Sequence, residues 1–334
     1  MARLDFFSQR FNYSFGPHTP TLTVDPGSAL RVICPDCDNT LADGQPLPAE
    51  QRCSDDPTNP MQGNPLAGPI FVRGAEPGDV LAVTIDHIEL DRSTGLTLLA
   101  PNHGVVPSDL LRGSKSDGVE AFSDVPRHMY HWSIDREARV ATIANPLGTD
   151  RLSAPLKPLV GCIGVCPDHD SFVSSLKCGS FGGNLDLPFI SSGATLFLPL
   201  RRTGGLLMLG DVHAAQGHGE IIGGGIETSG VVDCTLQLLK GRPLDTCVAW
   251  DADALTAVAV HDDLRQSIQR ACAALVCWLT AAGEVNQFDL YNLISQTATI
   301  TLGNLNHPPY PTAASVDTAH LPARLLDAMH RWRA

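Results

Sequence analysis

Residues 69–90 read PIFVRGAEPGDVLAVTIDHIEL, and this stretch decides the class of fold. A short apolar run leads into a Pro-Gly pair, after which two sets of alternate residues follow each other: Val80, Ala82, Thr84 and Asp86 against Leu81, Val83, Ile85 and His87. Such alternation is typical of a half-buried β-strand, and Pro-Gly marks a turn. The stretch therefore predicts two strands joined by a turn.

Other segments extend this β pattern. Residues 20–33 predict a strand on each side of a Pro-Gly-Ser turn, and residues 129–143 predict a hairpin. The Gly-rich stretch 158–232 holds short apolar runs separated by turn residues, none long enough to predict a helix. The stretch 34–68 is rich in Pro, Asp and Asn and predicts a long ordered loop, and such loops are often functional.

A helical pattern appears in the C-terminal third. Residues 262–283 carry apolar side chains at helical spacing, and we expect Asp262 to cap the start of this helix and Gly283 to end it. Residues 287–297 predict a second, shorter helix. The apolar face of the first helix is predicted to hold Leu264, Ile268, Cys272, Leu275, Val276 and Leu279.

Together these patterns predict an α+β, β-rich fold: a mixed β-sandwich or barrel-like core with a helical C-terminal segment. No alternation of strands and helices is visible, which argues against a doubly wound sheet or a TIM barrel. We expect residues 1–160 to form a β-rich N-terminal part. Residues 161–334 should form a Gly-rich β part with C-terminal helices, and the two parts should pack as one continuous unit.

Composition and charge exclude several classes of function. The chain has 334 residues, of which 43% are hydrophobic, so it can bury a sizeable core. Its net charge of −13 is repelled by phosphate backbones, and we expect no nucleic-acid partner. No segment reaches the roughly 18 apolar residues of a membrane helix, and the N-terminus lacks an apolar signal region. These features predict a cytoplasmic protein without a membrane partner.

The densest polar cluster in an apolar setting lies at residues 210–220. If its flanks are strands, Asp211 and His213 share one face, and so do His218 and Glu220. Carboxylates and imidazoles are ligands that Zn²⁺ prefers, and the small residues between them let a ligand approach. The alternative is a polar loop whose carboxylates cap backbone amides. The residues alone leave both interpretations open.

Two other groups of polar residues are less specific. Asn184 and Asp186 follow a double glycine and would share a face, but on these residues alone an Asx turn explains them better. Asp79, beside the Pro-Gly pair, is interpreted as a structural turn residue. Cys34-Pro-Asp-Cys37 has CxxC spacing, but no second CxxC completes a four-thiolate zinc site.

Four blocks follow one another along the chain: GPIFVRGAEPGDVLAVTI (68–85), GCIGVCP (161–167), GGNLDLPFISSGATLFLPL (182–200) and GDVHAAQGHGEIIGGGIET (210–228). In this order they resemble the acetamidase/formamidase family, and two weaker matches flank them. VICPDCDN (32–39) is similar to an N-terminal segment of the family, and NHPP (306–309) to its C-terminal end. His218 stands where the family more often has Asp.

The resemblance implies a β-rich hydrolase of small amides that forms a homo-oligomer, a dimer or larger. It also implies roles for the residues on the family's polar motif positions. These residues are Asp36, Asn184, Asp186, Asp211, His213, Gln216 and Glu220.

The chemistry of these residues suggests hydrolysis by a metal-activated water, with Zn²⁺ as the expected ion. We expect His213 and Asp186 to be ligands, with Asp36 or Asp211 completing the site. Glu220 is the expected general base. The expected substrate is a linear amide of the formamide or acetamide type. The expected oxyanion donors are the side-chain amides of Asn184 or Gln216 and the backbone of the Gly182-Gly183 turn.

Three alternatives remain at this point. The same scaffold could hydrolyse another C–N bond, in a carbamate, a urea-like compound or a cyclic amide. Cys162 or Cys166 could act as a nucleophile if a Glu and a Lys are held against it. The chain could also be a non-catalytic β-rich binding protein.

Overall fold

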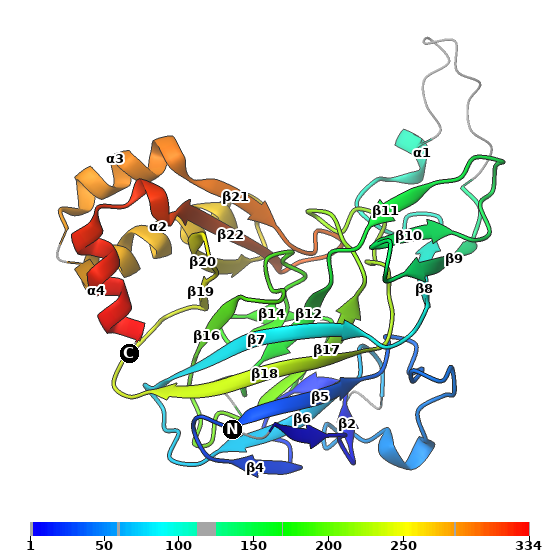
Figure 1. Ribbon diagram of the computed structural model, residues 1–334, viewed down its shortest axis with the longest axis horizontal. Helices are drawn as coiled ribbons and strands as arrows, with labels where there is room; N and C mark the ends of the chain where they lie inside the picture. The colour runs from blue at the N-terminus through cyan, green and yellow to red at the C-terminus, as the bar shows by residue number, and fades with distance from the viewer. Residues whose placement is uncertain (1–2, 59–60, 112–124, 169, 284, 334) are drawn as a thin grey trace, which may run out of the picture.

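The computed structural model describes residues 3–58, 61–111, 125–168, 170–283 and 285–333. Within these residues the chain is dominated by strands, with a half-barrel sheet and helices gathered near the C-terminus, and this confirms the predicted fold class (Figure 1). No helix in the described part is long and apolar enough to cross a membrane.

The largest sheet, called the large sheet here, has nine strands in the part of the chain that the structure describes. Its pairings are antiparallel except for the parallel pair of its first two strands. In spatial order the strands are β1 (Leu4–Phe6), β5 (Ala29–Cys34), β18 (Gly230–Leu239), β7 (Val80–Leu90), β16 (Thr195–Pro199), β19 (Val248–Trp250), β20 (Ala254–His261), β22 (Tyr310–Asp317) and β21 (Thr299–Leu302).

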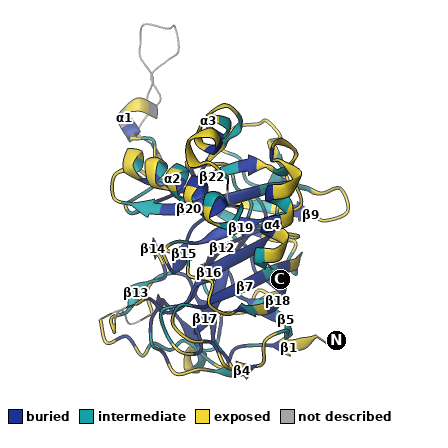
Figure 2. Ribbon diagram, turned by 90° about the vertical axis from the view of Figure 1, so that its left-hand side faces the viewer, coloured by how far each residue is buried: buried dark blue, intermediate teal, exposed yellow. Residues whose placement is uncertain are grey.

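A second sheet packs against the first half of the large sheet, and one apolar core fills the space between them. Val83 and Leu196 reach this core from the large sheet, and Ile163 and Leu209 from the second. Figure 2 shows that the strands are mostly buried. In spatial order the strands of the second sheet are β14 (Cys178–Gly179), β15 (Gly182–Asn184), β12 (Leu159–Gly164), β17 (Leu207–His213), β6 (Leu66–Val72) and β2 (Phe11–Asn12), with β4 (Leu22–Val24) paired to β6.

A smaller antiparallel sheet, called the small sheet, lies on the right in Figure 1. Glu227 connects it to the second sheet, because its backbone bridges both Leu96 and His213. The strands of the small sheet are β11 (Ser153–Pro155), β10 (Val140–Ile143), β9 (His128–Asp135) and β8 (Thr94–Leu99), and a separate pair is formed by β13 (Val173–Ser174) and β3 (Ser14–Phe15).

The helices near the C-terminus cover the other end of the large sheet and bury a second apolar core against it. Figure 2 shows their outer faces exposed. The long helix and its shorter neighbour appear where the sequence predicts them, whereas the sequence analysis did not predict the last helix. The helices are α1 (Ser108–Leu111), α2 (Leu264–Gly283), α3 (Gln287–Thr297) and α4 (Ala323–Arg333), with single 3₁₀ turns at Ala49–Gln51 and Thr318–His320.

Two details of α2 differ from the prediction. The capping residue is Asp263 rather than Asp262, because its Oδ1 accepts from the backbone N–H of Gln266 at 2.8 Å. The buried face is also rotated: Ser267 and Ala271 are buried, whereas Ile268 and Cys272 are not. The rotation follows from packing, since Ser267 Oγ makes hydrogen bonds to strands β20 and β22 at 3.1 Å and 2.8 Å.

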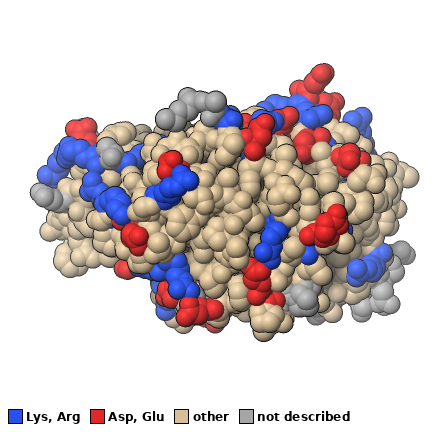
Figure 3. All heavy atoms as spheres, turned by 90° about the horizontal axis from the view of Figure 1, so that it is seen from below, with Lys and Arg blue, Asp and Glu red and all other residues tan. Residues whose placement is uncertain are grey.

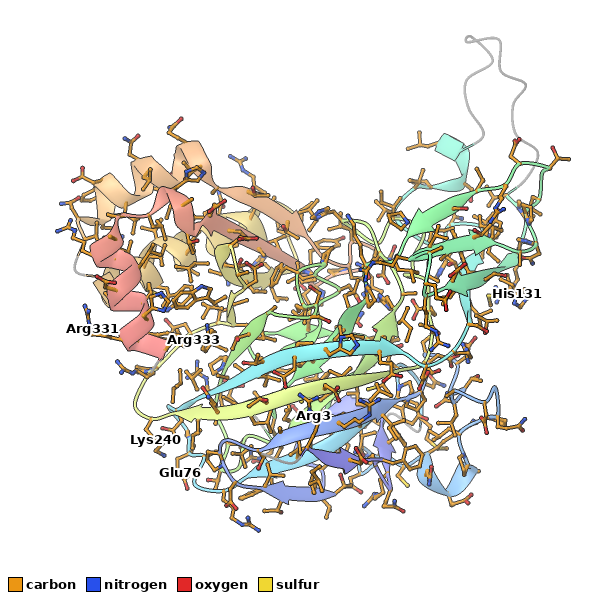
Figure 4. The ribbon with its side chains drawn as sticks, viewed as in Figure 1. Arg3, Glu76, His131, Lys240, Arg331 and Arg333 are labelled. Carbon is orange, nitrogen blue, oxygen red and sulfur yellow. The ribbon has the colours of Figure 1, made fainter. Side chains whose placement is uncertain are left out.

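The turn between β6 and β7 is held by a buried carboxylate. Asp79 accepts hydrogen bonds from the backbone N–H of Glu76 at 2.9 Å and from Lys240 Nζ at 2.5 Å. Figure 4 shows Glu76 and Lys240 at the same end of the large sheet. On the face seen in Figure 3, acidic and basic side chains are interspersed among uncharged ones.

Candidate active site

Strand β17 contains two of the predicted site residues, Asp211 and His213. All of its residues are buried, and it lies between β12 and β6 in the middle of the second sheet. Asp211 and His213 occupy alternate positions near its end, so their side chains share a face. Their atoms are close: Asp211 Oδ1 lies 3.3 Å from His213 Nε2.

Asp186 reaches the same point from the turn after β15. The backbone N–H of Asp186 donates to the carbonyl of Gly161 on β12 at 3.1 Å. A Cβ at Gly161 would lie 2.4 Å from Asp186 Oδ1 and 2.6 Å from Asp211 Oδ2, so only glycine lets the two carboxylates approach the strand this closely. His213 Nδ1 lies 4.0 Å from Asp186 Oδ1.

The chain after β17 folds back over His213. The backbone N–H of Ala214 donates a hydrogen bond to the carbonyl of Ile226, and the N–H of Ile226 donates to the carbonyl of Ala215. These two hydrogen bonds close a loop. This loop brings Glu220 and then Glu227 to the imidazole. Glu227 Oε1 lies 3.1 Å from His213 Nε2.

Three of these carboxylate residues have a strained backbone. Asp186, Asp211 and Glu220 have φ values of 47°, 62° and 47°, in the left-handed region that side chains other than glycine rarely adopt. Each such residue costs on the order of 1–3 kcal/mol, and such strain clusters at functional sites. The fold therefore holds these carboxylates in place at the expense of stability.

Among the described residues, two groups of side chains converge closely enough to hold a metal ion, and both contain His213. The first group is Asp186, His213 and Glu220, and the second is Asp211, His213 and Glu227. In each group the ligand atoms lie within 4.8 Å of one another. Three buried atoms at this centre have no hydrogen-bond partner: Asp186 Oδ1, His213 Nε2 and Glu227 Oε2.

The electrostatics of this centre favour a cation. Burial and the neighbouring Asp211 raise the pKa of Asp186 to about 7. Burial also raises the pKa of Glu220 and of Glu227. Burial alone would lower the pKa of His213, yet Glu227 and Asp211 raise it well above its usual value. Four carboxylates can carry more negative charge than the one positive charge of a protonated imidazole balances. Together with the unpartnered atoms, this donor set fits a divalent ion.

Gln216 links the two sides of the centre. Its Oε1 lies 2.7 Å from His213 Nδ1, and its Nε2 donates to the backbone carbonyl of Asp186 at 2.7 Å. One side chain thus holds both the imidazole ring and the backbone of Asp186.

Three asparagines that the sequence analysis missed orient the carboxylates. Asn64 donates to Asp211 Oδ2 at 2.7 Å. Asn304 donates to Asp186 Oδ2 and Asn306 to Glu220 Oε2, both at 3.2 Å. Asn306 opens the NHPP block and Asn64 lies in the long polar loop, which were the only sequence signals for them.

Glu227 was also missed, whereas Asp36 was expected as a ligand but belongs to neither group. Asp36 is buried, but Arg92 Nη2 donates to its Oδ2 at 2.6 Å and the backbone N–H of Thr40 to its Oδ1 at 2.7 Å. It belongs to neither metal-holding group. Glu227 could have been noted because it follows Glu220 in the same Gly-rich block.

The centre opens into a cavity of about 490 Å³. Asn184 lines this cavity, and Cys162 lies behind it with Sγ 2.8 Å from Asn184 Oδ1. Burial and Asp211 raise the pKa of the Cys162 thiol well above its usual value, which opposes thiolate formation. Apolar side chains form part of the wall: Leu96, Leu98, Met129 and Leu176.

The fold and this centre together define a β-rich protein with a cavity whose inner wall can hold a divalent cation. A model of the acetamidase/formamidase family matches residues 174–249. The crystal structure of an acetamidase from Yersinia enterocolitica superposes with a TM-score of 0.77 at 28% identity, over 95% of this chain and 92% of that one. These similarities support the resemblance to the acetamidase/formamidase family that the sequence blocks predicted.

Two curated relatives are similar over shorter stretches. An acetamidase of Mycolicibacterium smegmatis is 29% identical over 270 residues, which are 66% of this chain and 63% of the relative. A formamidase of Methylophilus methylotrophus is 27% identical over 262 residues, 67% of this chain and 63% of the relative. The matches thus span less than two thirds of the length of these relatives.

Proposed function

We propose that this protein hydrolyses small linear amides, of the formamide or acetamide type, to a carboxylate and ammonia. The observation that carries the proposal is the convergence of His213 with Asp186, Asp211, Glu220 and Glu227 at the wall of a cavity. The names of the relatives support the choice of amides over other substrates.

We propose that the ion is Zn²⁺, because imidazole and carboxylate donors suit it. His213 and Asp211 are the ligands common to the sequence prediction and the second group, and the choice of the remaining carboxylate is argued below. Bound there, the ion would supply Lewis-acid polarisation of the amide carbonyl and acidify water.

Glu220 is the proposed general base. Its burial favours proton uptake, and the hydrogen bond from Asn306 fixes the orientation of its carboxylate. It takes a proton from the attacking water, whose oxygen forms a bond to the amide carbon. It then delivers this proton to the amide nitrogen as the C–N bond breaks and ammonia leaves.

Asn184 is the proposed donor to the oxyanion. Two amide side chains were expected for this role, those of Asn184 and Gln216. Gln216 is less suited to it, because its Nε2 already donates to the Asp186 carbonyl. Asn184 lines the cavity, and its Oδ1 accepts from Cys162, so the amide side chain has a defined orientation. Such a donor is typically worth about 10²–10³ in rate.

Replacing Glu220 tests the mechanism. Glu220→Gln keeps the shape and the hydrogen-bonding atoms but removes the base, so kcat should fall by about 10²–10⁴ while metal content stays unchanged. Ammonia release and elemental analysis of the same preparation provide the two measurements. Near-normal kcat in this variant would exclude Glu220 as the base.

The size of the cavity favours a second candidate substrate class, namely carbamates, urea-like compounds or cyclic amides. A volume of about 490 Å³ falls in the range of sites for drug-sized ligands, well beyond what a formamide molecule fills. A panel of linear amides, a carbamate, a urea and a lactam, assayed for ammonia or amine release, separates the two classes. A binding protein without activity would turn over none of them.

The homo-oligomer stays a prediction from the resemblance, and light scattering on the purified protein tests it.

A further inference from the structure

The carboxylates around His213 approach different nitrogen atoms of its imidazole. His213 Nδ1 faces the first group, with Asp186 Oδ1 at 4.0 Å. His213 Nε2 faces the second, with Asp211 and Glu227 oxygens at 3.3 Å and 3.1 Å. A neutral imidazole has one nitrogen with a free lone pair, and the other carries the proton. The tautomer of His213 therefore decides which group can bind the ion through this ring.

The hydrogen bonds of Gln216 determine that tautomer. The backbone carbonyl of Asp186 can only accept, so the Gln216 atom 2.7 Å from it must be the amide nitrogen. This assigns the other end of the amide, 2.7 Å from His213 Nδ1, as the oxygen. An amide oxygen can only accept, so Nδ1 must carry the proton and donate it. A neutral ring, which metal binding requires, then has its lone pair on Nε2.

The atoms around Nε2 agree with this assignment. His213 Nε2 is buried and lacks a hydrogen bond, although two carboxylate oxygens lie within ion-pair distance. Glu227 Oε2 is likewise buried and without a partner. A lone pair on Nε2 would be repelled by these two carboxylates unless a cation, either a proton or a metal ion, lies between them.

The position of Gln216 is itself well fixed. It is the first residue after Ala215 in the loop that follows β17, and the backbone hydrogen bond between Ile226 and Ala215 closes this loop. A Cβ at Gly225 would lie 2.5 Å from His213 Nδ1, so this glycine leaves room for the ring beside the loop. The contact between Gln216 and the ring is thus part of the loop's folded geometry.

We propose that Gln216 is a positioning residue that holds His213 in the Nδ1–H tautomer and thereby assigns the ion to Asp211, His213 and Glu227. Asp186 and Glu220 then remain for proton transfer at the substrate. This inference rests on the proposed function, since it presupposes a bound divalent ion. A partner that orients a ligating histidine in this way typically contributes 10–100-fold to metal affinity.

The first experiment measures the tautomer and the affinity separately. In the Zn²⁺-loaded protein labelled with ¹⁵N-histidine, long-range nitrogen–proton spectra should show His213 with a proton on Nδ1 and the metal on Nε2. The signal is assigned by its loss in His213→Ala. Competition with a chelating dye should show that Gln216→Met binds Zn²⁺ about 10–100-fold more weakly.

The matched control is His218→Gln, which changes an exposed side chain two positions away in the same loop. It should bind Zn²⁺ as the wild type does. Circular dichroism and thermal unfolding establish that Gln216→Met is folded before its affinity is compared. Coordination through Nδ1, or unchanged affinity in folded Gln216→Met, would overturn the inference.

A second pair of variants locates the ion without relying on Gln216. Glu227→Gln should weaken Zn²⁺ binding at least 10-fold, while Asp186→Asn should weaken it less, because only Glu227 is a ligand in the assigned group. The reverse order would place the ion in the other group and overturn the assignment. The proposed function fails by a different outcome, namely a wild-type protein that binds no divalent ion at all.

Discussion

Asp79 and Asp186 are both buried aspartates, but the surrounding groups stabilise the negative charge of Asp79 and destabilise that of Asp186. Burial alone would raise the pKa of Asp79, but hydrogen bonds from Lys240 and the backbone lower it. Asp186 has one oxygen without a partner, and its pKa rises to about 7. A carboxylate whose oxygens are all engaged by donors holds a turn, whereas one that lacks donors is available for an ion or a proton.

The strongest test of this contrast removes the imidazole. His213→Ala should lose the bound metal ion and reduce amide hydrolysis by at least about 10², because polarisation by the ion is worth several kcal/mol. Elemental analysis and ammonia release measure the two effects. His218→Gln is again the control, and it should retain both metal and activity. A His213→Ala protein with normal metal content would show that the centre does not depend on this residue.

A second test uses the pH dependence of stability in the metal-free protein. In the folded state Asp186 keeps its proton up to a pH of about 7, whereas in the unfolded chain it loses it near pH 3.9. The stability that protonation contributes is therefore present below pH 3.9 and is lost as the pH rises through about 7. Asp186→Asn avoids this loss.

Urea unfolding after chelation should show Asp186→Asn more stable than the wild type by on the order of 2 kcal/mol at pH 8. Near pH 4 the difference should be much smaller. A variant that is less stable than the wild type at pH 8 would mean that Asp186 already has a stabilising ion pair with His213, and the contrast with Asp79 would fail.

The smallest expected effect is at the turn. Asp79→Asn removes a charged hydrogen bond to Lys240, which is largely exposed, and should lower the free energy of unfolding by about 1 kcal/mol at pH 7. Because the pKa of Asp79 is lowered in the folded state, this contribution is present above pH 4 and is lost as the pH falls through the folded value. Denaturation curves at pH 7 and pH 3 measure it, and amide hydrolysis should be unchanged. Loss of activity would contradict a purely structural role.

Part of this site could be predicted because the pattern is local. Asp211 and His213 are two positions apart in an apolar run, so the strand period alone puts them on one face. Asp186 was identified because it follows a double glycine and because its block resembles the acetamidase/formamidase family. Asp36 had the same kind of support, but its oxygens are engaged by Arg92 and Thr40, and no local pattern predicts such a pairing.

The residues that were missed all depend on packing between distant elements. Glu227 reaches His213 because its backbone bridges the small sheet and the second sheet. Asn64 and Asn304 come from loops far away in the chain. The buried face of α2 was misjudged for a similar reason, because Ser267 makes hydrogen bonds to two strands that a helical pattern cannot include.

The sequence by itself determined the succession of strands and C-terminal helices, the pairing of Asp211 with His213 on one strand face, and the resemblance to a known family. Periodicity and turn residues act over a few positions, so they can be deduced without coordinates. Only the tertiary structure decided which carboxylates meet the imidazole and which of its nitrogens Gln216 occupies. Those contacts join segments that are separate in the chain, and they form only when the sheets pack around a shared core.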